Sequence, residues 1–495
     1  MLRHTINKHA VVIGAGFGGI ASALRLRAKG YEVTIVDQCS RLGGRSQQFV
    51  KDGFVYDAGP TVVTAPFLFE ELFALFNEQM SDYFTLIPVE PWYRFVYPDG
   101  TKFDYGGTVE NTLAEIDKIN PADKAGYLSL LKQSQAIFDI GFTELSDTPF
   151  HKLSTMLSQV PALIRLKCYR TVWQMVCSFL KHDKLRQAFS IQPLLVGGNP
   201  FATTSIYSLI HYLERKWGVH FAMGGTASIV NGLEKLMVKQ GIKIQLNTAV
   251  DSLITDNNKI HQVKTVNSTL NADLVVSNID PKFLYTKLLN KQEQKFSARV
   301  KTKYASLSMG LFVLYFGTDK QYSDIVHHTI WLGKRYESLL SDIFDKHTLA
   351  EDFSLYLHRP TASDPSLAPE NCDSFYVLSP VPNNLSGIDW TSEKDRYAQK
   401  ILRALERSIM PGLSQHLVHY FAKTPQDFEK DYSSVQGSGF SIAPSFQQSA
   451  WFRFHNRAEG PDNLYLCGAG THPGAGIPGV LSSAKVVDKL IPSLT

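Results

Sequence analysis

Hydrophobic and polar positions at the start of the chain predict a strand, a tight turn, a helix and a second strand. Residues 11–13 are an apolar run of strand length, and residues 33–36 are another. Between them, apolar side chains recur at helical spacing over 20–29 until Gly30, which ends the predicted helix. This order of elements is typical of an α/β fold.

The rest of the chain alternates between helical and extended patterns. Residues 110–219 are mostly helical in pattern, whereas 242–280 is poor in helix and 304–434 mixes both patterns. Residues 464–490 return to a strand, a glycine-rich turn and a helix. The individual predictions are strands at 242–246, 274–276, 311–316, 375–378 and 464–466 and helices at 393–409 and 480–490.

A glycine pattern lies in the first turn, between the predicted strand and helix. Gly14, Gly16 and Gly19 fit G-x-G-x-x-G, in which the glycines allow the tight turn, admit a pyrophosphate and let the helix pack on the strand. The helix would direct free N–H groups and its positive dipole end at the phosphates. Asp37 ends the second strand, where a carboxylate binds ribose hydroxyls. The pattern predicts a dinucleotide site, and the alternative is a glycine-rich turn without a ligand.

Two further segments would complete such a site. Gly44 and Arg45 end the sequence RLGGR, where backbone amides can crowd an anion and the guanidinium can balance a pyrophosphate. Gly59, Pro60 and Thr61 belong to a turn of small residues against which a flat ring could lie. The alternatives are a basic surface loop for the first segment and a plain turn for the second.

The C-terminal glycine-rich segment indicates which dinucleotide is bound. It opens the last predicted helix, whose N-terminal end would stabilise negative charge on a reduced ring. A simple NAD domain has no use for such a segment so far from the first turn, whereas the isoalloxazine ring of FAD reaches far from its adenine. FAD is therefore the expected cofactor. The expected contact residues are Gly468, Gly470, Thr471, Gly476, Ile477, Pro478, Gly479 and Val480.

The phosphate and ring motifs lie at opposite ends of the chain, so the cofactor domain must be assembled from separate segments. We expect an α/β fold in which a Rossmann-like FAD-binding domain consists of residues 1–107, 220–285 and 435–495. Residues 108–219 and 286–434 would form a second, mixed α+β substrate domain with a membrane-facing helical part.

Composition narrows the classes of protein that fit. The chain has 495 residues, 44% of them hydrophobic, which suffices for a large core. Its net charge of +4, from 50 basic and 46 acidic residues, gives no indication of nucleic-acid binding. The five cysteines form no CxxC pair, which argues against a disulfide framework or a zinc site and fits a reducing compartment.

We expect no targeting or membrane-spanning segment. Arg3 and Lys8 precede the apolar run 10–24 and imitate a signal peptide, but this run contains the dinucleotide motif, which cleavage would destroy. No apolar stretch approaches the roughly 18 residues that cross a bilayer.

A basic segment nevertheless indicates contact with a lipid surface. Residues 152–186 contain seven lysines and arginines against one aspartate. A helix that begins at Pro161 would be basic on one side and apolar on the other, which is typical of an interfacial helix on anionic lipid. The alternative is a helix that packs on the core and exposes a basic side. The predicted apolar face consists of Val172, Trp173, Val176, Phe179 and Leu180.

Three other groups of residues contain side chains that could bind a metal, transfer a proton or line a tunnel. His327 and His328 are common metal ligands, but adjacent histidines on a strand point to opposite faces, so we expect no metal site. His472 either assists proton transfer near the ring or caps a turn. Nothing in the sequence singles out a catalytic base. An aromatic cluster would line a tunnel or belong to an ordinary sheet core, and it consists of Trp92, Tyr93, Phe95 and Tyr97.

The chain resembles the bacterial phytoene desaturase family over essentially its whole length, and most of all the branch that takes phytoene to lycopene. The N-terminal motif is shared by many flavoproteins, whereas the internal blocks and the C-terminal block are specific to carotenoid desaturases. Many such flavoproteins carry glutamate where this chain has Asp37, which should still bind a ribose. The resembling blocks are VVIGAGFGGIASALRLRAKGYEVTIVDQCSRLGGR, GFVYDAGPTVVT, LRQAFSIQPLLVGGNPFATTSIYSLIHYLE, EDFSLYLHRPTASDPSLAPE, QSAWFRFHNR and LYLCGAGTHPGAGIPGVLSSAK.

The resemblance implies an FAD-dependent oxidoreductase that acts on CH–CH groups of phytoene, with oxygen or a quinone as electron acceptor. It also implies contact of the Val250 backbone with adenine. A substrate that dissolves in the bilayer, together with the basic segment, predicts a peripheral place on the cytoplasmic side of the cell membrane, and the net charge predicts no nucleic-acid partner. A hydrocarbon offers no hydrogen-bonding group, so positioning against the flavin would do most of the catalytic work. The alternatives are another carotenoid or isoprenoid flavoprotein, such as an isomerase, ketolase or saturase, and a non-enzymatic isoprenoid carrier on the same fold.

Overall fold

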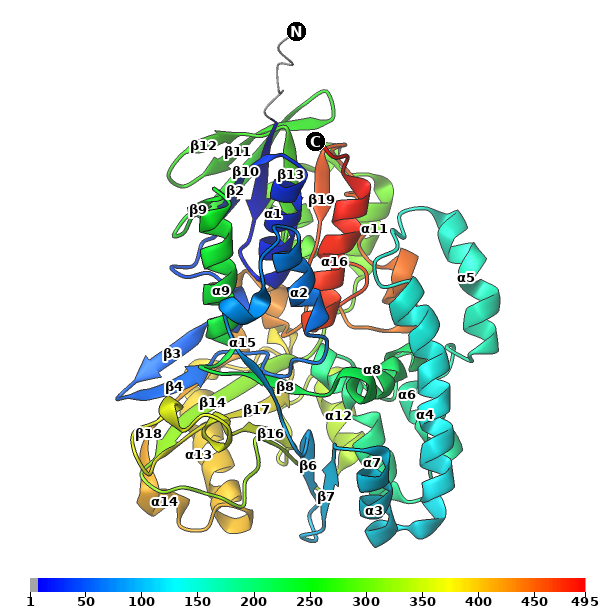
Figure 1. Ribbon diagram of the computed structural model, residues 1–495, viewed down its shortest axis with the longest axis vertical. Helices are drawn as coiled ribbons and strands as arrows, with labels where there is room; N and C mark the ends of the chain where they lie inside the picture. The colour runs from blue at the N-terminus through cyan, green and yellow to red at the C-terminus, as the bar shows by residue number, and fades with distance from the viewer. Residues whose placement is uncertain (1–7, 495) are drawn as a thin grey trace.

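In the computed structural model, which describes residues 8–494, a five-stranded parallel sheet carries the glycine-rich motifs (Figure 1). Its strand order brings the start, the middle and the end of the chain side by side, because β13 pairs with both β1 and β19. The strands in spatial order are β19 (Leu464–Leu466), β13 (Leu274–Ser277), β1 (His9–Ile13), β2 (Glu32–Val36) and β9 (Lys243–Gln245).

Both faces of this sheet are covered, which explains why its strands are apolar without alternation. Ala10 and Val12 pack on the helical side, whereas Val11 and Ile13 pack on the side of a three-stranded antiparallel sheet. The helices of the first side are α1 (Phe17–Ala28), α2 (Phe67–Ala74), α9 (Thr226–Lys239) and α16 (Ile477–Leu490). The strands of the second are β10 (Val250–Asp256), β11 (Lys259–Thr265) and β12 (Thr269–Asn271).

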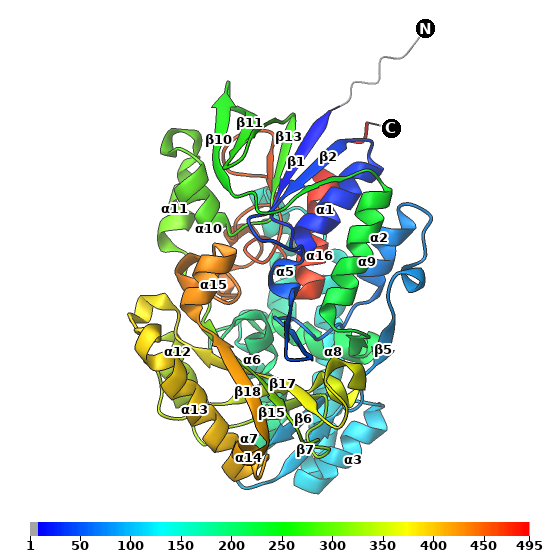
Figure 2. The ribbon, with the colours of Figure 1, turned by 90° about the vertical axis from the view of Figure 1, so that its left-hand side faces the viewer.

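A second sheet of seven strands lies at the other end of the molecule (Figure 2). It is antiparallel except between β15 and β6, and its strand β14 is buried along its whole length. In spatial order the strands are β18 (Leu417–Lys423), β14 (Gly310–Thr318), β17 (Asp373–Val381), β16 (Leu355–His358), β15 (His328–Trp331), β6 (Tyr93–Val96) and β7 (Lys102–Tyr105). The amphipathic helix α13 (Trp390–Ser408) packs its apolar face against β14 and β17.

A helical region flanks the second sheet and shares a core with β6 and β7. Its helices are α3 (Val109–Ile119), α4 (Lys124–Phe138), α5 (Leu153–Arg165), α6 (Val172–Phe179), α7 (Asp183–Ser190) and α8 (Leu209–Trp217). The remaining helices are α10 (Pro281–Phe283), α11 (Phe296–Tyr304), α12 (Tyr336–Phe344), α14 (Leu413–His416) and α15 (Pro425–Tyr432). Two further antiparallel pairs complete the fold. Strands β3 (Gln48–Lys51) and β4 (Phe54–Asp57) form a hairpin, and β5 (Leu86–Pro88) pairs with β8 (His220–Ala222).

The fold class expected from the sequence is confirmed. The predicted strand, turn, helix and strand are β1, α1 and β2, and the predicted helix at 393–409 is α13. The domain boundaries stay a prediction. Strands β6 and β7, which fall in the predicted segment 1–107, pair within the seven-stranded sheet.

The predicted interfacial helix is wrong in its bounds. Pro161 lies inside α5 instead of starting a helix, and the basic segment is divided among α5, α6 and α7. Proline leaves one carbonyl group of the preceding turn without its N–H donor. Here that carbonyl belongs to Leu157 on the exposed side of α5, so water can satisfy it and the helix continues.

The prediction that these apolar side chains contact lipid is also wrong, because they pack inside the protein. The ring of Trp173 lies against those of Phe201 and Tyr336, with centroids 4.8 and 5.8 Å away. The other members belong to the core of the helical region, with Val172, Val176 and Leu180 fully buried and Phe179 partly buried. Helical amphipathicity is the same for a core-facing and a lipid-facing helix, so the sequence pattern could not separate them.

No helix within residues 8–494 combines the length and the apolarity needed to span a bilayer. The apolar run 10–24 forms β1, the glycine-rich turn and the first part of α1. Arg3, the other half of the apparent signal-peptide pattern, lies outside the described residues.

Candidate cofactor and substrate site

A large cavity lies where the two sheets and the helical region meet. Its volume is about 650 Å³, its wall is mostly apolar, and the wall runs from the first turn of the chain to the C-terminal glycine-rich segment. Pockets that bind cofactors and drug-sized molecules have volumes of about 300–1,000 Å³ and the same mostly apolar character. The cavity is therefore the candidate site.

The turn between β1 and α1 exposes the start of α1 to this cavity. Gly14 has a φ of +92°, which favours glycine, and Gly16 is the residue that caps α1. A Cβ atom on Gly16 would meet only the Asn278 amide, at 3.0 Å, so its remaining surroundings are open toward the cavity. A Cβ atom on Gly19 would lie 1.9 Å from the carbonyl oxygen of Gly14, so this glycine serves helix packing. The arrangement suits a pyrophosphate at a helix N-terminus.

Asp37 follows the last residue of β2 and lies on the cavity wall. Its Oδ2 accepts a hydrogen bond from the Ala15 N–H at 2.6 Å, and its Oδ1 accepts one from the Cys39 N–H at 2.8 Å. The carboxylate thus ties the end of β2 to the glycine-rich turn, in the place where a ribose would be recognised.

Replacing Asp37 by alanine should weaken FAD binding by about 1–3 kcal/mol, or roughly 10–100-fold in Kd, because a charge-assisted hydrogen bond is lost. Titration of the FAD-free protein with FAD, followed by flavin fluorescence, measures the change. Asp251→Ala removes an exposed carboxylate from β10 and is the matched control. An unchanged Kd for Asp37→Ala would remove Asp37 from the site.

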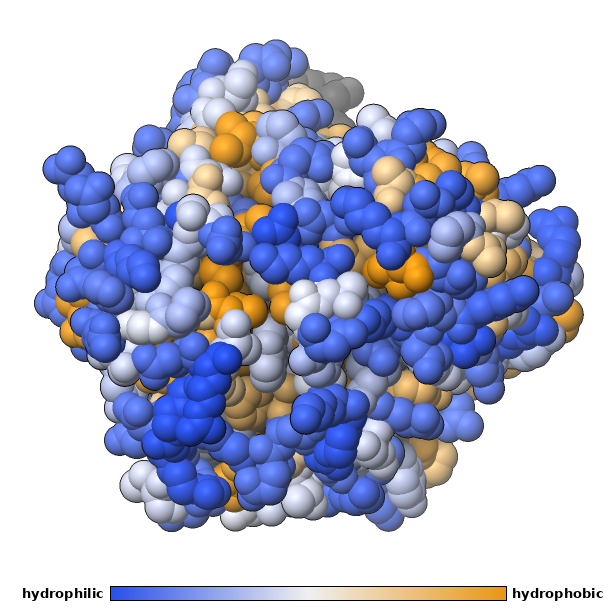
Figure 3. All heavy atoms as spheres, turned by 90° about the horizontal axis from the view of Figure 1, so that it is seen from below, coloured by the Kyte–Doolittle hydropathy of each residue, from blue (hydrophilic) through white to orange (hydrophobic). Residues whose placement is uncertain are grey.

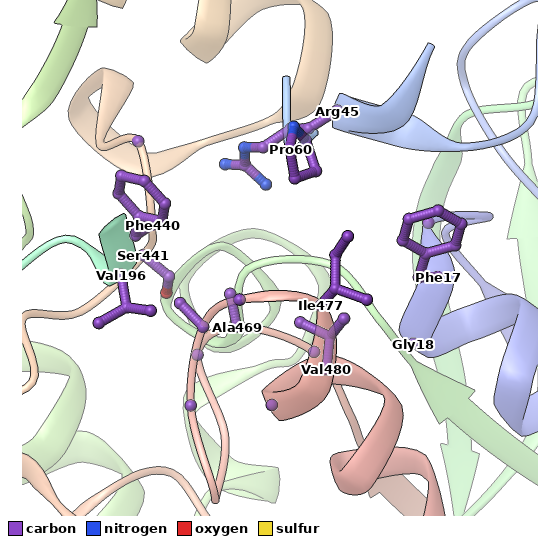
Figure 4. Close-up of a pocket in the computed structure, with 18 of the residues that line it drawn as sticks. Phe17, Gly18, Arg45, Pro60, Val196, Phe440, Ser441, Ala469, Ile477 and Val480 are labelled. Carbon is purple, nitrogen blue, oxygen red and sulfur yellow. The ribbon is translucent and has the colours of Figure 1, made fainter. Parts of the chain in front are cut away.

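Arg45 points into the cavity as a partly buried cation. In Figure 4 it lies with Pro60 on one side of the cavity, opposite Ile477 and Val480 at the start of α16. Its Nη2 donates to the Ser434 hydroxyl at 2.9 Å, while its Nε has no hydrogen-bond partner among the described residues. Burial lowers the pKa of Arg45. A cavity-lining guanidinium whose buried Nε has no partner favours an anionic partner in the cavity.

The C-terminal glycine-rich segment brings a second helix N-terminus to the same cavity. Gly476, with a φ of +90°, caps α16, and a Cβ atom on Gly479 would lie 2.5 Å from the carbonyl oxygen of Gly474. The buried Arg453 holds the segment in place by donating to the carbonyl oxygens of Thr471 at 2.9 Å and Ala469 at 2.6 Å. The N-termini of α1 and α16, which lie near opposite ends of the sequence, therefore face the same cavity.

Every predicted contact residue lines the cavity except Gly19 and Thr471. The Thr471 side chain is buried and donates to the Gly468 carbonyl oxygen at 2.9 Å, so it shapes the loop. Contact of the others with the cofactor stays a prediction. They are Gly14, Gly16, Asp37, Gly44, Arg45, Gly59, Pro60, Thr61, Val250, Gly468, Gly470, Gly476, Ile477, Pro478, Gly479 and Val480.

Among the polar residues of the cavity wall that the sequence did not single out, three are notable. Asn278 and Asp280 come directly after β13, at the carboxyl edge of the parallel sheet, and this position was the signal that could have found them. Burial raises the pKa of Asp280. Glu214 lies on α8 without any motif; its Oε1 accepts from the Tyr93 hydroxyl at 2.9 Å, and burial raises its pKa to about 8.

His472 lies on the cavity wall with its Nε2 2.7 Å from the Leu145 carbonyl oxygen. Burial lowers its pKa to about 4, so the ring is neutral and donates from Nε2. This bond anchors the glycine-rich segment to the helical region and favours the interpretation of His472 as a structural residue.

The predicted aromatic cluster belongs mostly to the protein core. All four of its side chains are buried, and only that of Tyr93 lines the cavity. The cluster consists of Trp92, Tyr93, Phe95 and Tyr97.

The residues of the cavity fit FAD. The open side of Gly16, the unused donor of Arg45 and the two helix N-termini provide places for the pyrophosphate and for negative charge on the ring. The apolar remainder of the cavity extends past this cradle between α5, α8 and the seven-stranded sheet.

Comparison with known proteins agrees with a flavin as the cofactor. Residues 17–487 match the family described as flavin containing amine oxidoreductase. The chain is 46% identical over 488 residues to a lycopene-forming phytoene desaturase of Pseudescherichia vulneris, which covers 98% of this chain and 99% of the relative. It is 42% identical over 490 residues to a neurosporene-forming phytoene desaturase of Rhodobacter capsulatus, and this match covers 98% of this chain and 94% of the relative.

The solved structures show the same fold at lower sequence identity. A crystal structure of an oxidoreductase from Methanosarcina mazei matches with a TM-score of 0.67 at 17% identity, covering 97% of this chain and 100% of that one. The predicted flavin cofactor and the predicted kinship are confirmed by these matches together with the family model. The chain belongs to the flavin containing amine oxidoreductase family, among the phytoene desaturases.

Proposed function

We propose that this protein is an FAD-dependent desaturase that converts phytoene to lycopene by successive dehydrogenations. The observation that carries the proposal is one continuous cavity that joins a dinucleotide cradle to an apolar chamber. A long hydrocarbon has no polar group to recognise, so an apolar wall beside the flavin is what its oxidation requires.

Residues in different parts of the cavity would contact different parts of FAD. FAD, when bound, supplies a two-electron acceptor for the hydrogen removed with its electron pair from a CH–CH unit. The α1 N-terminus and Arg45 would hold the pyrophosphate, Asp37 the ribose, and the α16 N-terminus would face the ring. Glu214, neutral below its raised pKa of about 8, adds no charge to the apolar wall at neutral pH.

Two relatives differ in the product for which they are named, lycopene or neurosporene. We propose lycopene for this chain because the similarity to the lycopene-forming relative is higher, at 46% against 42%. Expression in a bacterium that accumulates phytoene, with the pigments separated by chromatography, tests the proposal. Lycopene is the expected product, neurosporene would revise the number of steps, and unchanged phytoene would contradict the function.

We further propose that the protein docks on the surface of a membrane, where phytoene and a quinone acceptor dissolve, with oxygen as the alternative acceptor. More than half of the large apolar side chains that are exposed in the described residues lie on α5, on α11 and in the loops beside them. These elements are adjacent, because Lys301 of α11 donates to the Trp451 carbonyl oxygen and α5 packs on the same loop. The exposed side chains are Leu153, Leu157, Ile164, Tyr169, Phe296, Val300, Tyr304, Phe446 and Phe452.

Helix α5 connects this apolar surface to the cavity. Leu157 and Ile164 are each 60% exposed on its outer side, while Met156 and Leu163 on its inner side line the cavity. Figure 1 places α5 at the outer edge of the helical region. By contrast, Figure 3 shows that the lower end of the molecule is largely hydrophilic with scattered apolar residues. A hydrocarbon could therefore pass from lipid to the cavity beside α5.

Replacing Leu157, Ile164 and Phe296 together by glutamine should lower the partition of the protein onto liposomes by about 3 kcal/mol, or roughly 100-fold. Flavin content should stay at the wild-type value, since these side chains do not line the cavity. Co-sedimentation with anionic liposomes measures the change. The control carries glutamine at three exposed apolar positions elsewhere, Val238, Ile254 and Val266. Equal loss in both variants would refute this docking surface.

A further inference from the structure

Three buried histidines meet beside the cofactor cradle, at the edge where β15 pairs with β16. His328 and His358 are directly opposite each other on these antiparallel strands, so their side chains share a face of the sheet. His327 precedes β15, in a bend rather than in the strand. The alternation expected of adjacent strand residues therefore does not apply to it, and its ring lies 4.5 Å from that of His328 and 4.8 Å from that of His358, between centroids. The expectation that these histidines point apart is wrong.

Each of the three rings has one nitrogen beside an oxygen atom of the protein. His327 Nδ1 lies 2.7 Å from the Ser363 hydroxyl, and His328 Nδ1 lies 2.7 Å from the Tyr356 hydroxyl. His358 Nε2 lies 3.6 Å from Oδ2 of Asp57, too far for a hydrogen bond, and has no hydrogen-bond partner among the described residues. Hydrogen bonds like those of His327 and His328 fix the orientation and the tautomer of metal-binding histidines.

The opposite nitrogen of each ring has no hydrogen-bond partner among the described residues. These atoms are His327 Nε2, His328 Nε2 and His358 Nδ1. The three side chains are between 0% and 4% exposed. A buried polar atom without a partner destabilises the folded protein, so three such nitrogens in one place favour a shared ligand that satisfies all of them.

We propose that His327, His328 and His358 bind a divalent first-row transition-metal ion, with Ser363 and Tyr356 orienting the first two rings from behind and the Asp57 carboxyl group facing the third. One ring nitrogen from each histidine lies within 4.8 Å of the other two. Ligand atoms around tetrahedral zinc are about 3.3 Å apart, so the ring nitrogens would have to approach one another by up to about 1.5 Å when the ion binds. Imidazole nitrogen is a preferred ligand of zinc, copper, nickel and iron, and zinc is the probe of choice because it has no redox chemistry.

The site would couple the second sheet to the cofactor cradle. Asp57 stands at the end of β4, directly before the turn that contains Gly59, Pro60 and Thr61. Its Oδ1 accepts a hydrogen bond from the Thr226 N–H at 2.8 Å, at the start of α9. An ion bound to His358 would therefore brace the wall against which the flavin ring is expected to lie, and its role would be structural.

The test compares zinc content in proteins purified from cells grown with added zinc. Wild type should hold about one zinc per chain by elemental analysis, and His327→Ala should hold less than a tenth of that. Ser363→Ala leaves all three ligands in place and should weaken zinc binding about 10–100-fold. His261→Ala, which removes an exposed histidine from β11, is the control and should keep the wild-type content.

A measurement on the unmodified protein guards against variants that fail to fold. Prolonged treatment of the flavin-loaded wild type with a chelator should lower its Tm, and zinc should restore it. A wild type without zinc whose Tm responds to neither treatment would overturn the proposal, as would equal zinc content in wild type and a folded His327→Ala. Because zinc content and Tm are read without substrate, a protein that binds zinc but does not desaturate phytoene would contradict the proposed function alone.

Discussion

Replacing Gly16 by valine should yield a folded protein that retains almost no flavin. Gly16 caps α1, and its Cβ direction is blocked only by the side-chain amide of Asn278 at 3.0 Å. A valine side chain can therefore be accommodated by the protein, but it would occupy the space that a pyrophosphate needs at the helix N-terminus. We expect the Kd for FAD to rise at least about 100-fold, which corresponds to roughly 3 kcal/mol.

Flavin absorbance per chain after purification, and FAD titration of the flavin-free protein, measure this change. Ala28→Val introduces the same side chain in the last turn of the same helix, away from the cavity wall, and should retain the flavin. Circular dichroism of both variants should match the flavin-free wild type. A folded, yellow Gly16→Val protein would show that the pyrophosphate does not lie at this turn.

Replacing Glu214 by glutamine should make the stability of the protein less dependent on pH. Burial raises the pKa of Glu214 to about 8 in the folded protein, whereas the unfolded chain has the ordinary value of 4.5. The folded state therefore holds a proton that the unfolded state has lost, and wild-type stability falls as pH rises from about 4.5 to about 8. Over this window the loss amounts to about 5 kcal/mol, a contribution that the glutamine variant lacks.

The advantage of Glu214→Gln over wild type should accordingly grow between pH 5 and pH 9, as measured by thermal or urea unfolding of both proteins. Glutamine keeps an oxygen that accepts from the Tyr93 hydroxyl, so packing is little changed. Glu70→Gln, at an exposed position of α2, is the control and should follow the wild-type profile. Stability curves that stay parallel for Glu214→Gln and wild type would contradict a buried, protonated Glu214.

The elements around the cofactor could be predicted because their signals are local. The G-x-G-x-x-G pattern between an apolar run and a helical pattern determines β1, the turn and α1. The glycine-rich segment before α16 was predicted to approach the same cofactor from the other end of the chain, and the strand order brings β19 and β1 into one sheet.

The histidine cluster and the surface helices could not be predicted, since both depend on where the chain turns in space. His327 faces His328 only because β15 begins one residue later, and His358 arrives from another strand. The apolar residues of α6 and the exposed residues of α5 have similar spacing, and only packing against α4 and the second sheet distinguishes them. Glu214 is one polar position in an amphipathic helix and becomes notable only through burial.

The measurement that tests the central claim most directly is a single turnover without oxygen. Protein loaded with FAD is mixed anaerobically with phytoene in liposomes, and the absorbance of the oxidised flavin is followed while the carotenoids are extracted and separated. We predict that the flavin band bleaches as a desaturated carotenoid appears, with one double bond formed per flavin, and that readmitting an acceptor restores the band. A flavin that stays oxidised while phytoene remains unchanged would contradict the assignment of this protein as a phytoene desaturase.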